Sequence, residues 1–301
     1  MTTQKVSPPT TPPPNQIFAS LTLDSLDPAN PGFQLLQKLG LWPELSFESS
    51  WSKLSPDQFR EKAKIVSDHF PGAAVHLPYG GLDFGRGDNF LEKKDRLLQA
   101  TELAELFAPT HLIGHPNFQS LSDSVLGQKK YAGFKRGNLQ GPSQTPAQWW
   151  LDRSISVWSA VLAVSSAQLR LENTYEHSPE PILILLHQLG ERAGFCLDLG
   201  HWFYYAMGRH WDNLDFWLTQ TATKLAHAHV HDNNGEGDQH RPLGQGLINY
   251  GRVRQLLAEK ELRPPYTIEN HRPQDLRASF NELTQNPLWR ETDLDLERKV
   301  S

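Results

Sequence analysis

Eight short apolar runs, most of them followed by a stretch with helical spacing of apolar residues, occur between residues 17 and 268. Alternating strands and helices produce a parallel sheet with right-handed crossovers. Eight such units close into a (β/α)8 TIM barrel of roughly 250 residues, and residues 16–290 provide that length in a single α/β domain. The predicted strands are 17–21, 45–48, 73–76, 110–114, 168–171, 194–197, the segment around 227, and 266–268.

Two stretches carry a strong helix-start signal. Ser55 and Thr145 each precede a proline and stand three residues before a glutamine, which is typical of a capping box with proline at the first helical position. An apolar stripe at helical spacing follows the second start and consists of Leu151, Ile155, Trp158 and Leu162. The alternative architecture, a doubly wound open sheet, needs a glycine-rich turn after the first strand, and residues 23–26 do not supply one.

Three segments fall outside this regular pattern. Residues 1–15 are mainly Pro, Thr and Ser, so we expect a disordered tail. Residues 291–301 form a charged C-terminal tail that we expect to fray. Residues 117–144 are the longest irregular stretch, and such loops are usually lids or binding loops. Its lysines and arginines could hold a phosphate, and a solvated surface loop is the alternative.

The charge and the cysteine count narrow the possible partners. A net charge of -5 provides no overall basic surface for DNA, so nucleic acid is an unexpected partner, although a local patch is compatible with that total. One cysteine allows neither an intrachain disulfide nor a thiolate metal cage, and suits the reducing cytoplasm. No apolar run has the length of a signal peptide or a membrane span. Trp149 and Trp150 could form a homo-oligomer contact or lie in the core.

The segment 227–246 is rich in residues that bind metals. His227, His229 and His231 alternate, so in a strand they share one face. Asp238 and His240 follow at the same spacing. Neutral imidazole and carboxylate are ligands that Zn, Mn, Fe and Co prefer. A histidine-rich surface loop is the alternative interpretation.

Other predicted strands also end in such residues, and the active site of a TIM barrel lies where its strands end. Glu172 and Glu269 follow apolar residues, and a buried carboxylate without a partner costs several kcal/mol. Few lysines or arginines stand at strand ends, so a divalent metal is the simplest counter-charge. The six predicted strand ends are His76, His115, Glu172, Asp198, His229 and Glu269.

Simpler roles remain open for several of these residues. His76 and His115 could each be a hydrogen-bonded core histidine. Asp198 could cap the helix that follows it, and His201 could be a ligand or could line the pocket. Three aromatic residues are candidates for pocket walls or for the core: Tyr79, Trp202 and Phe203.

Together, the motifs HLPY, GHP, LENT, LDLGH, HVHDN, DQHRPLGQG and IEN resemble the xylose isomerase-like barrel superfamily over residues 16–285. The resemblance implies a sugar or sugar phosphate isomerase or epimerase with one divalent ion, which could be Mn, Mg, Co or Zn. Glu172 and Glu269 would then also transfer a proton through a metal-stabilised enediolate, while His201 and Arg241 contact a sugar or polyol substrate. The implied metal ligands are Glu172, Asp198, His229 and Glu269.

The same superfamily contains endonuclease IV, which binds three metals and cleaves phosphodiesters. Residues matching its additional ligands are present: His76 and His115 would join Glu172 at one further site, and His201, Asp238 and His240 would form another. We expect the isomerase activity, with the endonuclease as the alternative, because the chain has no overall basic surface and contains HVHDN. A barrel that binds a polyol without turnover is a third possibility.

Overall fold

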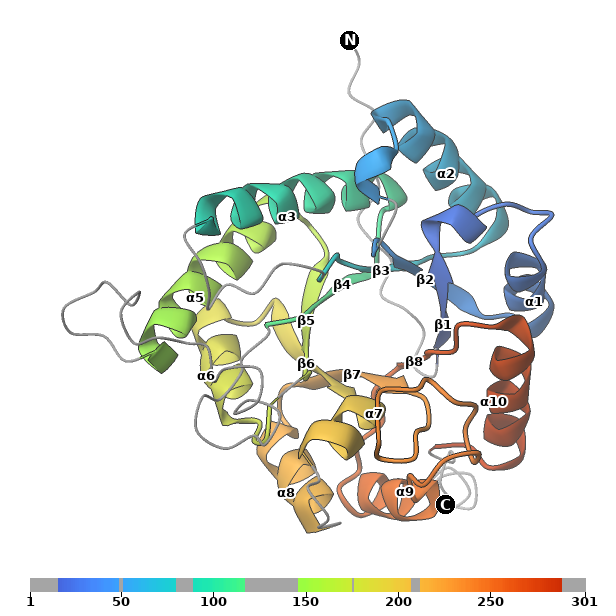
Figure 1. Cartoon of the computed structure of the whole chain (residues 1–301), viewed down its shortest axis with the longest axis vertical. Helices are drawn as coiled ribbons and strands as arrows, with labels where there is room; N and C mark the ends of the chain where they lie inside the picture. The colour runs from blue at the N-terminus through green and yellow to red at the C-terminus, as the bar shows by residue number, and fades with distance from the viewer. Residues whose placement is uncertain are drawn as a thin grey trace, which may run out of the picture.

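Eight parallel strands form a closed barrel in chain order, with β8 returning to pair with β1 (Figure 1). This computed structural model describes residues 16–48, 51–79, 89–116, 146–174, 176–206 and 212–288. The predicted single-domain (β/α)8 fold is confirmed. The strands are β1 (Ile17–Thr22), β2 (Trp42–Ser46), β3 (Ala74–His76), β4 (His111–Gly114), β5 (Gln168–Glu172), β6 (Ala193–Asp198), β7 (Leu225–Val230) and β8 (Tyr266–Ile268).

Helices surround the barrel in the order of the strands (Figure 1). The long ones are α1 (Pro31–Leu39), α2 (Pro56–His69), α3 (Phe90–Ala104), α5 (Pro146–Val164), α6 (Glu180–Leu189), α8 (Asp212–Thr221), α9 (Tyr250–Glu259) and α10 (Pro273–Gln285). The short α7 (Leu199–His201) follows β6 directly and continues into a π-helix at Trp202–Ala206. Among the described residues, no helix combines the length and apolarity needed to cross a membrane.

The cap signals in the sequence have direct structural counterparts. Ser55 caps α2 by accepting a hydrogen bond from the backbone of Gln58, whose side chain accepts one from the backbone of Ser55. In α5, Trp158 and Leu162 are buried, and the rest of the predicted stripe packs against the core. Thr145 lies outside the described residues. Trp150 is a core residue whose indole donates to the carbonyl of Pro116.

Two features of the first barrel unit differ from the prediction. A helix, α1, connects β1 to β2, and the Asn30 side chain caps it ahead of a proline at the first helical position. The second strand begins at Trp42 rather than Leu45, because Trp42 pairs in register with Phe18 of β1 despite the proline that follows it. This correction matters for the site, since it places Glu44 in the middle of a barrel strand.

The strand alternation separates an outer apolar layer from a polar barrel interior. On β7, Ala228 and Val230 belong to the hydrophobic core, while His227 and His229 alternate with them on the opposite face. The predicted common face is therefore confirmed for His227 and His229, whereas His231 lies just beyond the end of the strand. The tails 1–15 and 291–301 and the loop 117–144 lie outside the described residues, and their predicted roles stay predictions.

Candidate metal centre

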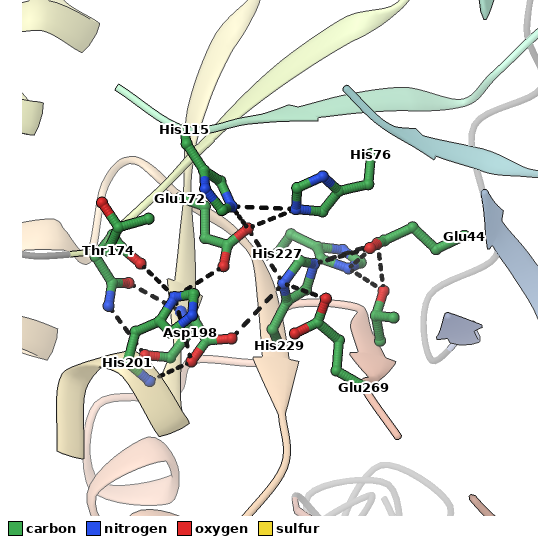
Figure 2. A network of polar contacts seen from close by, with 12 residues as sticks. Glu44, His76, His115, Glu172, Thr174, Asp198, His201, His227, His229 and Glu269 are labelled. Atoms are coloured by element: carbon green, nitrogen blue, oxygen red, sulfur yellow. Dashed lines mark hydrogen bonds and ion pairs between the residues drawn. The ribbon is translucent and has the colours of Figure 1, made fainter. Parts of the chain in front are cut away.

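Four acidic and imidazole side chains meet at the carboxyl ends of neighbouring strands (Figure 2). Glu172 and Asp198 end β5 and β6, His229 lies near the end of β7, and Glu269 follows β8. One potential ligand atom from each of these residues lies within 4.8 Å of those of the other three. This is the four-residue set that the superfamily resemblance implied, and the barrel brings it to one place.

Glu172 is the most heavily contacted member of this set. Its Oε2 lies 3.1 Å from His76 Nε2, 3.0 Å from His115 Nε2 and 3.3 Å from His229 Nδ1. Its Oε1 lies 3.1 Å from Nδ1 of His201. The carboxylate is buried, with only 1 % of its side chain exposed. Both oxygens are therefore shared among imidazoles.

His76 and His115 form a triangle of potential ligand atoms with Glu172. The two Nε2 atoms lie 3.1 Å apart, and each lies 3.0–3.1 Å from the same carboxylate oxygen. Ligand atoms around one zinc ion at about 2.0–2.1 Å lie about 3.3 Å from one another in a tetrahedron. The triangle thus has the size of a metal site. Histidines that only filled the core would not need to converge in this way.

A third cluster lies beside the first two. Nε2 of His201 and Nε2 of His240 lie 3.1 and 3.2 Å from Oδ2 of Asp238. His231 joins them, and potential ligand atoms of all four residues lie within 4.8 Å of one another. The predicted triad of His201, Asp238 and His240 is therefore brought together, with one additional imidazole that was not assigned to it from the sequence.

Asp198 caps the helix that follows it and also lies within the candidate ligand set. Its Oδ1 accepts a hydrogen bond of 2.5 Å from the backbone of His201 and so caps α7. Its Oδ2 makes no hydrogen bond to any described residue. This oxygen lies 3.8 Å from Nδ1 of His229 and faces the other members of the ligand set. The amide side chain of Asn173 accepts from the Asp198 backbone N–H and donates to the Asp198 carbonyl, which joins the ends of β5 and β6.

The loop after β7 is held by Asp232. Its backbone exchanges two hydrogen bonds with that of Arg241, and its carboxylate accepts from the backbone of Gly244. A side chain at Gly246 would lie 2.2 Å from the same carboxylate, so only glycine fits there. The loop thereby returns Asp238 and His240 to the strand ends. The side chain of Arg241 is partly buried and is not among the described residues that line the cavity below.

A family model described as xylose isomerase-like TIM barrel matches residues 32–292. This chain belongs to the xylose isomerase-like TIM barrel family. Two uncharacterised proteins of Methanocaldococcus jannaschii are 30% and 27% identical over 101 and 135 residues, or 34% and 42% of this chain. The matched parts span 37% and 45% of those relatives.

Solved structures of this family share the fold over nearly the whole chain. A D-tagatose 3-epimerase-like protein has a TM-score of 0.65 at 18% identity and covers 95% of this chain and 100% of its own. Endonuclease IV of Thermus thermophilus has a TM-score of 0.59 at 17% identity, with coverages of 90% and 99%. The TTHB071 protein of the same organism, soaked with zinc chloride, has a TM-score of 0.61 at 21% identity, with coverages of 90% and 97%. These neighbours include an epimerase-like protein and an endonuclease, and identities this low show a common fold alone.

A small polar cavity of about 90 Å³ opens onto the centre of this family member. Tyr79 forms one wall and stacks on the ring of His115, with ring centroids 4.5 Å apart. Trp202 and Phe203 are core residues and are not among the described residues of the lining. The cavity is lined by His76, Tyr79, His115, Glu172, Thr174, His201, Tyr205, Asp238, His240 and Glu269.

Glu44, which lies beneath the centre, was not predicted from the sequence. Both of its oxygens lie 3.2 Å from Nε2 of His229, and the hydroxyl of Thr267 donates to it at 2.6 Å (Figure 2). His229 therefore directs one ring nitrogen towards the ligand set and the other towards Glu44. A carboxylate within an apolar strand could have indicated a buried functional residue. Because the strand was predicted to begin at Leu45, Glu44 was placed outside it.

His227 lies deeper in the barrel and has a different environment. Its Nε2 lies 2.8 Å from the hydroxyl oxygen of Thr267, and its ring packs against His111 with centroids 4.6 Å apart. Burial lowers the pKa of His111 to about 3 and that of His227 well below its ordinary value. Both are neutral histidines of the barrel interior.

The carboxylates of the centre control the charge of its imidazoles. Burial opposes the charged form of His76, but the hydrogen bond to Glu172 raises the pKa of His76 to about 9. Burial likewise opposes protonation of His240, and Asp238 raises the pKa of His240 to about 9. In the metal-free protein both imidazoles are therefore protonated at pH 7.

Metal binding is expected to release protons, because a metal ligand must be a neutral imidazole. His76 and His240, whose pKa values are raised to about 9, and His201 and His229, whose pKa values are raised well above the ordinary value, should together release about four protons per chain at pH 7 when zinc binds. Affinity for zinc should accordingly increase as the pH rises towards 9. Calorimetric titrations in buffers of different ionisation enthalpy measure this number. Binding without proton release at pH 7 would contradict the assignment of these four side chains as ligands.

Proposed function

We propose that this chain is a metal-dependent hydrolase of phosphate esters with three divalent ions at the mouth of its barrel. The triangle of His76, His115 and Glu172, with edges of 3.0–3.1 Å, is the observation that supports this proposal best. An isomerase that binds one ion does not require this additional metal site. A cluster of ions, in contrast, suits the displacement of a group from phosphorus.

The position of Glu172 supports the same conclusion. A glutamate that removes a proton from a sugar carbon needs a free oxygen facing the substrate. Both oxygens of Glu172 lie 3.0–3.3 Å from imidazole nitrogens, and the side chain is buried. This arrangement suits a carboxylate that bridges two neighbouring ion sites.

The unsatisfied atoms of the centre fit divalent cations. Oδ2 of Asp198, Nδ1 of His229 and both ring nitrogens of His231 are buried and make no hydrogen bond to any described residue. Such groups are costly unless a cation or donor meets them. The sites would be formed by His76, His115 and Glu172, by Glu172, Asp198, His229 and Glu269, and by His201, Asp238 and His240.

The mixture of imidazole and carboxylate donors suits zinc, and also manganese or cobalt. Bound ions of this kind supply Lewis acidity and lower the pKa of water. Around them, Glu269 borders the cavity that an entering water would occupy. Burial and the nearby Glu48 carboxylate keep the pKa of the Tyr79 hydroxyl above its ordinary value, so that hydroxyl remains uncharged beside the cavity.

A metal-dependent sugar isomerase or epimerase acting through an enediolate is the second candidate. Glu172 and Glu269 both border the cavity, as a pair of proton-transferring carboxylates must. Structural neighbours also include epimerases, one of them for D-psicose. In this case one ion would suffice, and the substrate would be a small sugar or polyol.

Metal content and activity together separate these functions. We expect about three zinc ions per chain after reconstitution, together with hydrolysis of bis(p-nitrophenyl) phosphate. Abasic DNA and small phosphodiesters, assayed in parallel, distinguish a nucleic-acid substrate from a small one. One ion per chain and deuterium incorporation into a ketose in heavy water would overturn the hydrolase in favour of the isomerase. Tight polyol binding without either reaction would instead indicate a non-catalytic barrel.

A further inference from the structure

His231 lies directly after β7, and no hydrogen bond accounts for its burial within the described part of the chain. The residue has no exposed surface, and both of its ring nitrogens lack a hydrogen-bond partner there. Its Nε2 lies 3.3 Å from Oδ1 of Asp198 and 3.6 Å from Oδ1 of Asp238. Its ring stacks on that of His240, with centroids 4.0 Å apart and an angle of 13° between the planes.

The surrounding backbone is arranged to accommodate this ring. A Cβ at Gly200 of α7 would lie 1.9 Å from the His231 ring, so a side chain there would displace it. The hydroxyl of Tyr250 donates to the His231 carbonyl at 2.7 Å. The Asn233 amide donates to the Gly200 carbonyl at 3.0 Å and joins the strand end to α7. The imidazole is therefore held in place from both sides.

We propose that His231 is a fourth ligand at the site of His201, Asp238 and His240, which would make this site a closed one. The inference rests on the metal centre proposed above and adds a ligand to it. Potential ligand atoms of the four residues lie within 4.8 Å of one another. Four protein donors are the number found in closed zinc sites, whereas catalytic zinc sites keep one position open.

A closed site has a different task from the neighbouring triangle of His76, His115 and Glu172, which has three donors. Its four donors come from α7, the end of β7 and the following loop, so an ion there joins three separate segments. The triangle borders the cavity, and so do His201, Asp238 and His240, so the number of donors separates the two sites. We therefore assign substrate contact to the ion of the triangle, which keeps an open position, and a retained, loop-anchoring ion to the site of His231.

Replacing His231 with Asn tests this assignment, with His187→Asn on the exposed face of α6 as the matched control. The zinc-loaded proteins are treated with a chelator, and the ions retained per chain are measured by mass spectrometry over time. The unchanged protein and the control should retain one slowly released ion. In His231→Asn that ion should leave at least about tenfold faster. Cobalt-loaded samples should lose the strong visible absorption typical of four-coordinate cobalt.

Gly200→Ala provides a second test, because it displaces the imidazole without removing it. The same faster release is expected, and this variant carries the test if His231→Asn fails to fold. An unchanged release rate in a folded variant would overturn the role of His231, and would indicate that the ring only pairs with Asp198. Absence of any bound ion in the unchanged protein would overturn the metal centre as a whole, so the two failures are distinguishable.

Discussion

Replacing Glu172 with Gln is expected to reduce turnover by at least roughly 100-fold, because a direct ligand should matter at least as much as the residues that orient one, whose loss costs 10–100-fold. Gln preserves the size of the side chain and removes its charge. His76, His115, His201 and His229 all lie within 3.3 Å of the Glu172 oxygens. Two of the three proposed ion sites share this carboxylate, so both should lose affinity together.

Metal content per chain, measured beside phosphodiester hydrolysis, checks this expectation. Glu172→Gln should retain only the ion near His231, which does not use Glu172. Glu259→Gln on α9 is the matched control, because that glutamate is half exposed and contacts only surface side chains in the described structure. A Glu172→Gln protein that still binds three ions would show that the carboxylate is not a shared ligand.

Changing Glu44 should weaken metal binding without removing a ligand. Residues that orient a metal-bound histidine typically contribute 10–100-fold in affinity or activity. Glu44 contacts His229 at 3.2 Å on the side away from the ligand set. Burial opposes its ionisation, yet His229 keeps the pKa of Glu44 below the ordinary value, so it is an anion. We expect roughly 10-fold weaker zinc binding for Glu44→Gln and about 100-fold for Glu44→Ala.

A competition titration against a coloured chelator measures this difference and does not depend on turnover. The affected ion should be the one beside His229, and the closed site near His231 should keep its affinity. Glu105→Gln is the control, since Glu105 is also hydrogen-bonded, to Ser165 and Ser166, but lies outside the barrel. Unchanged zinc affinity in folded Glu44→Ala would mean that Glu44 only fills the barrel interior and balances its charge.

The parts of the fold and of the site that could be predicted are those marked by patterns in neighbouring residues of the sequence. Apolar runs and the polar residues that end them are local, so seven strand positions and the six polar strand ends could be identified, whereas the choice of ligands among them came from the family resemblance and stays a prediction. Glu44 was missed because Pro43 interrupts a strand that barrel pairing with β1 nevertheless extends. The helix α1 was missed although Asn30 and Pro31 formed the same type of start that identified α2.

Local sequence patterns could not reveal which of these side chains meet in the folded protein. Whether His231 meets Asp238 depends on how the loop after β7 returns, and that depends on Asp232 binding backbone groups of residues 244 and 248. Similarly, the roles considered for Asp198 could not be separated in advance, since it caps α7 and faces the ligand set at once. Loop closure and strand register decide these points.

The origin of the ligands in many different strands has a consequence for how the protein matures. Glu44 and His229 are separated by 185 residues, and Glu44 and Thr267 by 223. No fragment shorter than nearly the full barrel contains the complete centre, and contacts so distant in sequence form slowly. Ion capture should therefore be a late event in maturation, which would make bound zinc a reporter of correctly completed chains.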